Sequence, residues 1–172
     1  MTGMTIRASV PDDAEAVERL RIAGWRTAYR GILPDQYLDG LPVDVPRRRR
    51  HMEDLPADIT DEVAIADEGI VGWIASGPCR DPDRKGPRYG EIFACYVRPD
   101  LWRKGTGRVL MGHAIDGLVR AGRDDISLWV LEGNDRARRF YETFGFGPDG
   151  TRKMMDFGEP VAEVRYRRLP TA

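Results

Sequence analysis

A buried strand, a basic glycine loop and the start of a helix follow one another in the second half of this sequence. The apolar run is Ile92–Val97, and the loop after it reads Arg98-Pro-Asp-Leu-Trp-Arg-Lys-Gly-Thr-Gly-Arg108. A helix beginning near Gly107 directs several backbone N–H groups and the positive end of its dipole at one spot, which predicts a site for a phosphate-bearing ligand. Three cationic side chains add positive charge there: Arg103, Lys104 and Arg108.

Two common nucleotide-binding motifs do not fit this loop. A Walker A loop requires a Lys directly after its second glycine, whereas Lys104 precedes Gly105. A dinucleotide fingerprint requires a third glycine three residues after Gly107, where the chain has Leu110. A tight turn whose glycines only relieve backbone strain is the alternative at this point. The loop alone therefore indicates an anion without identifying it.

Length and composition predict one soluble domain over residues 1–172, long enough to bury a core. The formal net charge of −1 favours neither nucleic acid nor a membrane surface as a partner. No apolar run reaches the roughly 18 residues of a membrane span. Two cysteines without a signal peptide predict free thiols in a reducing cytoplasm.

The spacing of apolar residues predicts an α/β fold, in which an antiparallel meander is followed by β-α-β units. We expect one central mixed sheet, mostly antiparallel, of about six or seven strands flanked by about four helices. The expected strands are 5–9, 63–67, 70–76, 91–97, 126–131, 151–157 and 161–169. The clearest expected helices are 14–29, 107–121 and 134–145, with shorter ones near 34–41 and 46–50.

A second motif follows the glycine loop. It reads Leu128-Trp-Val-Leu-Glu-Gly-Asn-Asp-Arg-Ala-Arg-Arg-Phe-Tyr-Glu-Thr-Phe-Gly-Phe146, a strand and then a helix that begins at Asn134 and ends at Gly145. It resembles the second signature of the GCN5-related N-acetyltransferase (GNAT) superfamily, and the glycine loop resembles the first. The order of elements, the distance between the signatures and the opening Trp25-Arg-Thr-Ala-Tyr-Arg-Gly31 also match. The resemblance spans essentially the whole chain.

This resemblance implies an N-acetyltransferase that moves an acetyl group from acetyl-CoA to a primary amine by direct transfer in a ternary complex. The acceptor would be a small-molecule or peptide amine, and homodimers are frequent in the family. A non-catalytic acyl-CoA-binding or sensor module on the same fold is the alternative. A small kinase is a more distant one, because the chain lacks the P-loop lysine and a suitable Mg²⁺-binding aspartate. His51 and His113 are isolated, so no metal site is expected.

The resemblance also implies which residues contact acetyl-CoA. The glycine loop would hold the diphosphate, and the strand before it would pair with pantetheine, with the Val97 N–H as the oxyanion donor. The loop departs from the family at Trp102, where Gln or Arg is usual, so one phosphate contact is in question. The implied cofactor residues are Cys95, Tyr96, Val97, Arg103, Lys104, Gly105, Thr106, Gly107, Arg108, Asn134, Ala137 and Tyr141.

Tyr141 is the candidate general acid. Asn134, Ala137 and Tyr141 are three and four residues apart, so they share one helical face toward the cofactor. Tyr141 would donate its proton to the departing sulfur. Two structural alternatives stay open: Tyr141 as a core aromatic residue, and Asn134 as a plain helix N-cap, which is compatible with a cofactor contact.

Glu91 is the candidate base. Its place at the start of the central strand resembles that of the catalytic Glu in the histone acetyltransferase branch. Unbroken period-two alternation would put it on one face with Phe93, Cys95 and Val97. A solvated strand-entry residue, with water taking the proton, is the alternative.

The first helix supplies two candidate acceptor-binding residues, Trp25 and Tyr29, for which a core or lid role is equally compatible. The run Arg47–Arg50 reads as a solvated helix face, because no aromatic residues are interleaved with it. Cys95 lies in a strand expected to be buried and has no evident partner for nucleophilic catalysis.

Overall fold

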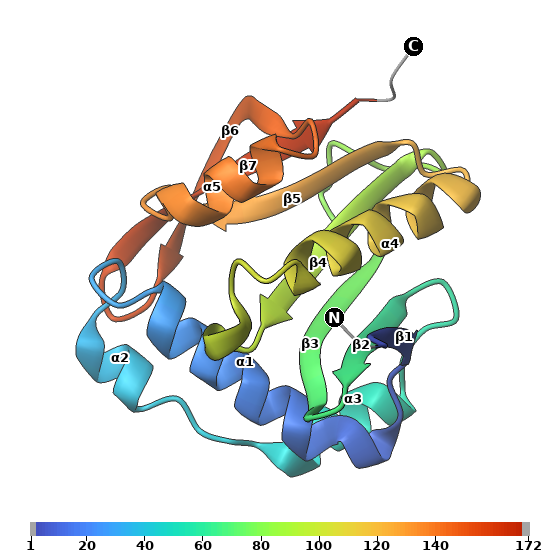
Figure 1. The fold of residues 1–172 in the computed structure, drawn as a ribbon. Helices are drawn as coiled ribbons and strands as arrows, with labels where there is room; N and C mark the ends of the chain where they lie inside the picture. The colour runs from blue at the N-terminus through green and yellow to red at the C-terminus, as the bar shows by residue number, and fades with distance from the viewer. Residues whose placement is uncertain (1–2, 170–172) are drawn as a thin grey trace.

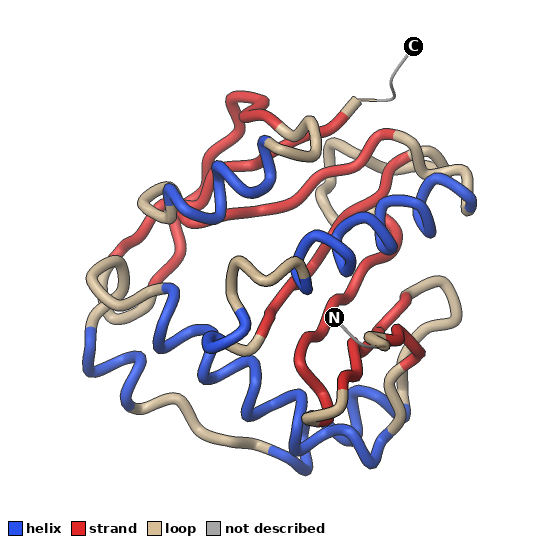
Figure 2. The backbone as a smooth tube through the Cα atoms, in the orientation of Figure 1, coloured by secondary structure: helices blue, strands red, loops and turns tan. Residues whose placement is uncertain are grey.

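One seven-stranded sheet in the order β1-β2-β3-β4-β5-β7-β6 organises the chain. The structure is a computed structural model that describes residues 3–169. Helices lie on both faces of the sheet (Figure 1 and Figure 2). The strands are β1 (Thr5–Ala8), β2 (Thr60–Ala66), β3 (Gly69–Pro78), β4 (Tyr89–Val97), β5 (Asp125–Leu131), β6 (Gly147–Asp156) and β7 (Pro160–Arg168). The helices are α1 (Ala14–Ala28), α2 (Asp35–Asp39), α3 (Val45–Glu53), α4 (Thr106–Arg120) and α5 (Asp135–Glu142).

The expected α/β architecture is confirmed. All strand pairs are antiparallel except β4 and β5, so the sheet is mixed and mostly antiparallel. The described residues hold five α-helices because the two short segments after α1 both form helices, α2 and α3. Strand β6 begins at Gly147, four residues earlier than expected, because an irregularity in its pairing with β7 spans Pro148 to Arg152.

The helix after the glycine loop packs closely on the centre of the sheet. The apolar stripe of α4, which includes Leu110 and Ala114, is buried against β3, β4 and β5. Gly72 on β3 permits this approach, because a Cβ there would lie 2.6 Å from Cδ1 of Leu110. Helix α1 covers the other face through Val17 and Leu20. This packing places the start of α4 at the end of β4.

Strands β4 and β5 pair over only three residues and then part. Tyr89–Glu91 pairs with Asp125–Ser127 in parallel, and β5 then continues with β7 alone as far as Leu131. The sheet is therefore open between Ile92–Val97 and Leu128–Leu131. We call this opening the wedge. Figure 1 shows β5 diverging from the second half of β4.

A β-bulge at Phe93 changes the direction in which the side chains of β4 point. Ala94 pairs with Ala75, but Ile92 pairs with Ser76, so Phe93 is an extra residue in β4. Because of this extra residue, Glu91 and Phe93 line one face of the sheet while Cys95 lies on the other. The expected common face of Glu91, Phe93, Cys95 and Val97 is therefore wrong, since it assumed unbroken alternation.

Candidate active site

A cavity of about 570 Å³ lies between the glycine loop, the start of α4 and helix α5. We call it the cofactor cavity. Eight of the predicted cofactor residues line it: Cys95, Val97, Arg103, Gly105, Gly107, Arg108, Ala137 and Tyr141. It is also lined by Leu101, Trp102, Arg136, Arg139, Phe140 and Thr143. Four predicted residues are not on its wall: Tyr96, Lys104, Thr106 and Asn134.

The start of α4 presents unpaired backbone donors to this cavity. Gly105 precedes the helix with φ 97°, and the first helical bond is from Val109 N to Gly105 O, at 3.1 Å. The N–H groups of residues 106–108 therefore have no partner within the helix. Together with the helix dipole, they form an environment suited to an anion. The left-handed conformations of Gly105 and Arg103 (φ 64°) give the loop its shape.

Four arginines line the cofactor cavity, and none of them forms an ion pair with a carboxylate of residues 3–169. Arg103 and Arg136 lie close enough for the charge of one to affect the other, since the pKa of Arg136 is lowered first by desolvation and then by Arg103. The cavity wall thus carries positive charge without a protein counter-ion. The four residues are Arg103, Arg108, Arg136 and Arg139.

Trp102 and Arg136 form a contact across the cavity. The Trp102 indole N–H donates to the carbonyl oxygen of Val97 at 2.8 Å, and the Arg136 guanidinium carbon lies 3.4 Å from the centre of the Trp102 ring. Sequence reasoning missed Arg136 and Arg139. Their position in the first turns of α5, three residues apart, is the signal that would have placed both on one helical face.

The backbone of β4 has free groups in the wedge. Arg98 N donates to Val71 O at 3.0 Å, and in an antiparallel pair bonded and non-bonded residue pairs alternate. Tyr96 is therefore bonded to β3, whereas the N–H and C=O groups of Cys95 and Val97 face the wedge. The Val97 carbonyl is taken by Trp102. Tyr96 therefore has no free backbone group for the expected cofactor contact. Its side chain lies on the opposite face of the sheet.

Tyr141 and Cys95 meet on the cofactor side of the wedge. Burial raises the pKa of Tyr141 well above its usual value and raises that of Cys95 to about 12, so both groups are protonated near neutral pH. The Tyr141 ring packs on Phe140 and Phe146, at centroid distances of 5.6 and 6.4 Å. Asn134 accepts a hydrogen bond from Ala137 N at 3.2 Å, so it is the N-cap of α5.

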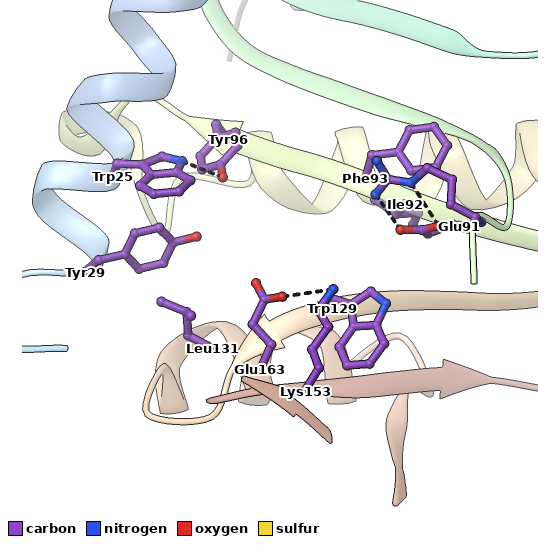
Figure 3. A pocket seen from close by; sticks show the side chains of 11 residues that line it. Trp25, Tyr29, Glu91, Ile92, Phe93, Tyr96, Trp129, Leu131, Lys153 and Glu163 are labelled. Atoms are coloured by element: carbon purple, nitrogen blue, oxygen red, sulfur yellow. Dashed lines mark hydrogen bonds and ion pairs between the residues drawn. The ribbon is translucent and has the colours of Figure 1, made fainter. Parts of the chain in front are cut away.

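A second cavity, of about 180 Å³, lies on the other face of the sheet. We call it the acceptor cavity (Figure 3). Trp25 of α1 and Tyr29, the residue that follows this helix, lie on its wall, and the Trp25 indole N–H donates to the Tyr96 hydroxyl at 2.7 Å. Burial, followed by the neighbouring phenols of Tyr96 and Tyr141, raises the pKa of Tyr29. Tyr29 of the acceptor cavity is therefore near enough to Tyr141 of the cofactor cavity for the two groups to affect each other.

Glu91 is buried on the wall of the acceptor cavity and is ion-paired with Arg80. Its carboxylate accepts from the Arg80 side chain at 2.6 and 3.2 Å and from the Arg80 backbone N–H at 2.9 Å. The Arg80 guanidinium also lies over the Phe93 ring, 4.2 Å from its centre. The remaining wall comes from strands β4 to β7. The last hairpin was expected to contribute to acceptor specificity, but none of these residues was singled out from the sequence: Ile92, Trp129, Leu131, Lys153 and Glu163. Period-two spacing on β5 could have grouped Trp129 with Leu131, but it does not show which strands are neighbours.

The described residues 3–169 contain no group of three or more His, Cys, Asp or Glu side chains placed to hold a metal ion. In the same part of the chain, no helix is long and apolar enough to cross a membrane.

The sheet is thus open in its middle, with a positively charged cavity on one face and a smaller cavity on the other. The sequence profile of the Acetyltransferase (GNAT) family matches residues 25–146, which is more than half of the chain. The chain belongs to this family, and it is an acyltransferase of the N-acetyltransferase type.

Two of the relatives match over most of their length. A protein named as a probable N-acetyltransferase, Rv2775 of Mycobacterium tuberculosis, is 31% identical over 181 residues, covering 99% of this chain and 97% of its own. The uncharacterized N-acetyltransferase YuaI of Bacillus subtilis is 28% identical over 132 residues, covering 76% of this chain and 73% of its own. The crystal structure of the PaiA N-acetyltransferase of Thermoplasma acidophilum, in complex with coenzyme A, has the same fold. Its TM-score is 0.77 at 19% identity, with 98% of this chain and 99% of that chain covered.

Proposed function

We propose that this protein transfers an acetyl group from acetyl-CoA directly to a primary amine, with both substrates bound at once. The proposal rests on the positive charge of the cofactor cavity, which no carboxylate of residues 3–169 pairs with. This cavity lies next to the wedge, which leads toward the acceptor cavity. A diphosphate and a further phosphate on the cofactor supply the matching negative charge.

The cofactor binds through backbone and arginine donors. The N–H groups of residues 106–108 hold the diphosphate at the start of α4, with the backbone of Lys104 and Gly105 shaping the loop. Arg103, Arg108, Arg136 and Arg139 supply charge-assisted hydrogen bonds to the phosphates. The free backbone groups of Cys95 and the N–H of Val97 pair with the extended pantetheine, as an added strand pairs with a sheet edge.

Tyr141 and Val97 serve the transfer step. The amine nitrogen attacks the thioester carbon, and the Val97 N–H donates to the oxygen that becomes negative, a contribution of about 2.7–4 kcal/mol for one such donor. The C–S bond then breaks, and the Tyr141 hydroxyl gives its proton to the leaving sulfur. Two features are compatible with this role: burial raises the pKa of Tyr141 and so keeps its hydroxyl protonated, and this hydroxyl has no hydrogen-bond partner among residues 3–169.

Glu91 takes the proton of the attacking amine in this proposal. Its position on the acceptor cavity supports the role, and its ion pair with Arg80 holds the carboxylate in place. Because three donors already contact this carboxylate, a water molecule between it and the amine completes the path. Trp25 and Tyr29 line the space in which the amine lies.

Two measurements test the proposal. Calorimetry should show saturable binding of acetyl-CoA to the purified protein, and release of coenzyme A thiol should follow when a panel of primary amines is added. Absence of acetyl-CoA binding would contradict the proposal. Binding without thiol release for every amine would instead favour a non-catalytic acyl-CoA sensor.

A further inference from the structure

Lys153 of β6 directs its ammonium group to the wall of the acceptor cavity. We use this contact to extend the proposed function, and the inference rests on that function. Its Nζ lies 3.2 Å from Oε2 of Glu163 and 3.9 Å from the centre of the Trp129 ring. Figure 3 shows this ammonium group beside the Glu163 carboxylate, which faces the cavity. A carboxylate beside an aromatic face is an environment that binds alkylammonium groups. The wall therefore already holds a cation of the kind that an amine substrate carries.

The carboxylate and the ring are held in place by the sheet. Glu163 pairs with Leu131 in the register of β7 and β5. The Trp129 indole N–H donates to both oxygens of Asp81, at 3.1 and 3.2 Å, and Asp81 also accepts from buried Arg165 at 3.1 Å. These contacts fix the orientation of the Trp129 ring without using Lys153.

The cation is the more mobile partner. The Lys153 side chain is 41% exposed on a strand at the edge of the sheet, whereas that of Glu163 is 19% exposed. A lysine can move its ammonium group into water at little cost, because its flexible stem and exposed position make such a pair weak. When Lys153 moves away, a partly buried carboxylate and a fixed aromatic face remain without a cation.

We propose that Glu163 and Trp129 form a subsite for a second cationic group of the acceptor, so that alkyl diamines are the preferred acceptor class. One amine nitrogen of such a molecule reacts at the wedge, and the other, as an ammonium, replaces Lys153. The opposite assignment, in which Lys153 and Arg80 bind a carboxylate of the acceptor, is a distinct outcome of the same experiment.

The test compares three amines of one length: 1,4-diaminobutane, butylamine and 4-aminobutanoate, each at saturating acetyl-CoA with thiol release as the readout. We expect kcat/KM for the diamine to exceed that for butylamine by about tenfold or more, the value of one charge-assisted contact. Glu163→Gln should reduce this ratio toward one, and Lys153→Met should lower the KM for the diamine by removing the competing cation. Diamines of three and five carbons then measure the distance to the subsite.

A matched control is a second ion pair, between β6 and the turn that follows β5. Arg152 of β6 pairs with Glu132 at 3.0 Å, and neither lines the acceptor cavity. Glu132→Gln should therefore leave the diamine preference unchanged, and thermal unfolding verifies that each variant is folded. Equal rates for diamine and butylamine, or fastest turnover of 4-aminobutanoate, would overturn the subsite. Failure of the proposed function would look different, because no amine would then release thiol or acetyl-CoA would not bind.

Discussion

The guanidinium of Arg136 lies flat against the indole of Trp102, 3.4 Å from the centre of the ring. This contact joins the glycine loop to α5 across the cofactor cavity. Trp102 occupies the position where the family usually has Gln or Arg, so the loop lacks that polar side chain. Arg136 of α5 places its guanidinium beside the glycine loop from the opposite wall of the cofactor cavity, where it packs on the Trp102 ring.

Replacing Arg136 should therefore weaken cofactor binding. Arg136→Ala removes one charge-assisted contact to phosphate, worth about 1.5–3 kcal/mol, so calorimetry should show a 10- to 100-fold rise in the Kd of acetyl-CoA. Arg47→Ala, which removes an exposed arginine of α3 remote from the cavity, is the control and should leave the Kd unchanged. Equal affinities for Arg136→Ala and the control would remove Arg136 from the phosphate site.

Tyr141→Phe should slow turnover without weakening cofactor binding. The ring keeps its packing on Phe140 and Phe146, but the sulfur loses its proton donor. We expect kcat to fall by about 100-fold or more, as general acids contribute. Steady-state kinetics with the best amine of the panel measures this, and calorimetry verifies that the Kd of acetyl-CoA is retained. A wild-type rate would show that Tyr141 is only a packing residue.

Glu91→Gln tests which group accepts the amine proton. If the carboxylate is the base, kcat/KM should fall by about 100-fold or more, as loss of a general base does. The amide has nearly the same shape but cannot pair with the charge of Arg80, so thermal unfolding must be measured alongside. A folded variant with the wild-type kcat/KM would assign the proton to water.

Gly72→Ala should destabilise the fold at the contact between α4 and β3. The added Cβ would lie 2.6 Å from Leu110 Cδ1 and 3.3 Å from Tyr96 O, so either the buried Leu110 side chain or the helix must shift. Overpacking of this kind costs about 1–3 kcal/mol of unfolding free energy. Gly112→Ala, in α4 with no atom within 4 Å of the new Cβ, should instead stabilise by about 0.5–1 kcal/mol. Urea unfolding of both variants distinguishes crowding from a general effect of replacing glycine.

Asp125 should make stability depend on pH in the acid range. This buried carboxylate lies between Arg84 and Arg167, and their hydrogen bonds and charges, opposing its desolvation, lower its pKa to about 2. Because the folded-state pKa lies below the unfolded value of about 3.9, the stabilisation is present above pH 4 and is lost as the pH falls toward 2.

The corresponding measurement compares wild type with Asp125→Asn by urea unfolding at pH 7 and near pH 2. The difference in unfolding free energy between the two proteins should shrink by about 2 kcal/mol at the lower pH. Asp12→Asn, at an exposed pair with Arg49, is the control and should differ little from wild type at either pH. A gap that does not change with pH would show that Asp125 acts through packing alone.

The elements that sequence patterns could predict are those whose signals are local. The glycine loop, the stripe on α4 and the Asn134 cap each lie within one short segment, and all three are present in the structure. The bulge at Phe93 has no local signal, because the extra residue shows only against the register of β3. The role of Trp102 likewise depends on Arg136, which approaches from another element.

The acceptor cavity was the least predictable part of the site. Trp25 and Tyr29 could be assigned to it through the family resemblance, but Lys153 and Glu163 enter through the neighbour order of β5, β7 and β6. That order is set by long-range pairing, which one sequence does not reveal. Glu91 was placed near the acceptor by the family resemblance together with an assumption of regular alternation. It does line the acceptor cavity, but the bulge at Phe93 breaks the alternation that was assumed.

The wedge has a thermodynamic consequence. A sheet that is open in its middle leaves the backbone groups of Cys95 and the N–H of Val97 without a partner strand on the side of the wedge. In the proposed function, acetyl-CoA pairs with these backbone groups. Its binding free energy therefore also stabilises the folded state, and this stabilisation increases with the logarithm of the acetyl-CoA concentration. The abundance of acetyl-CoA in the cell would then set the lifetime of this protein as well as its rate.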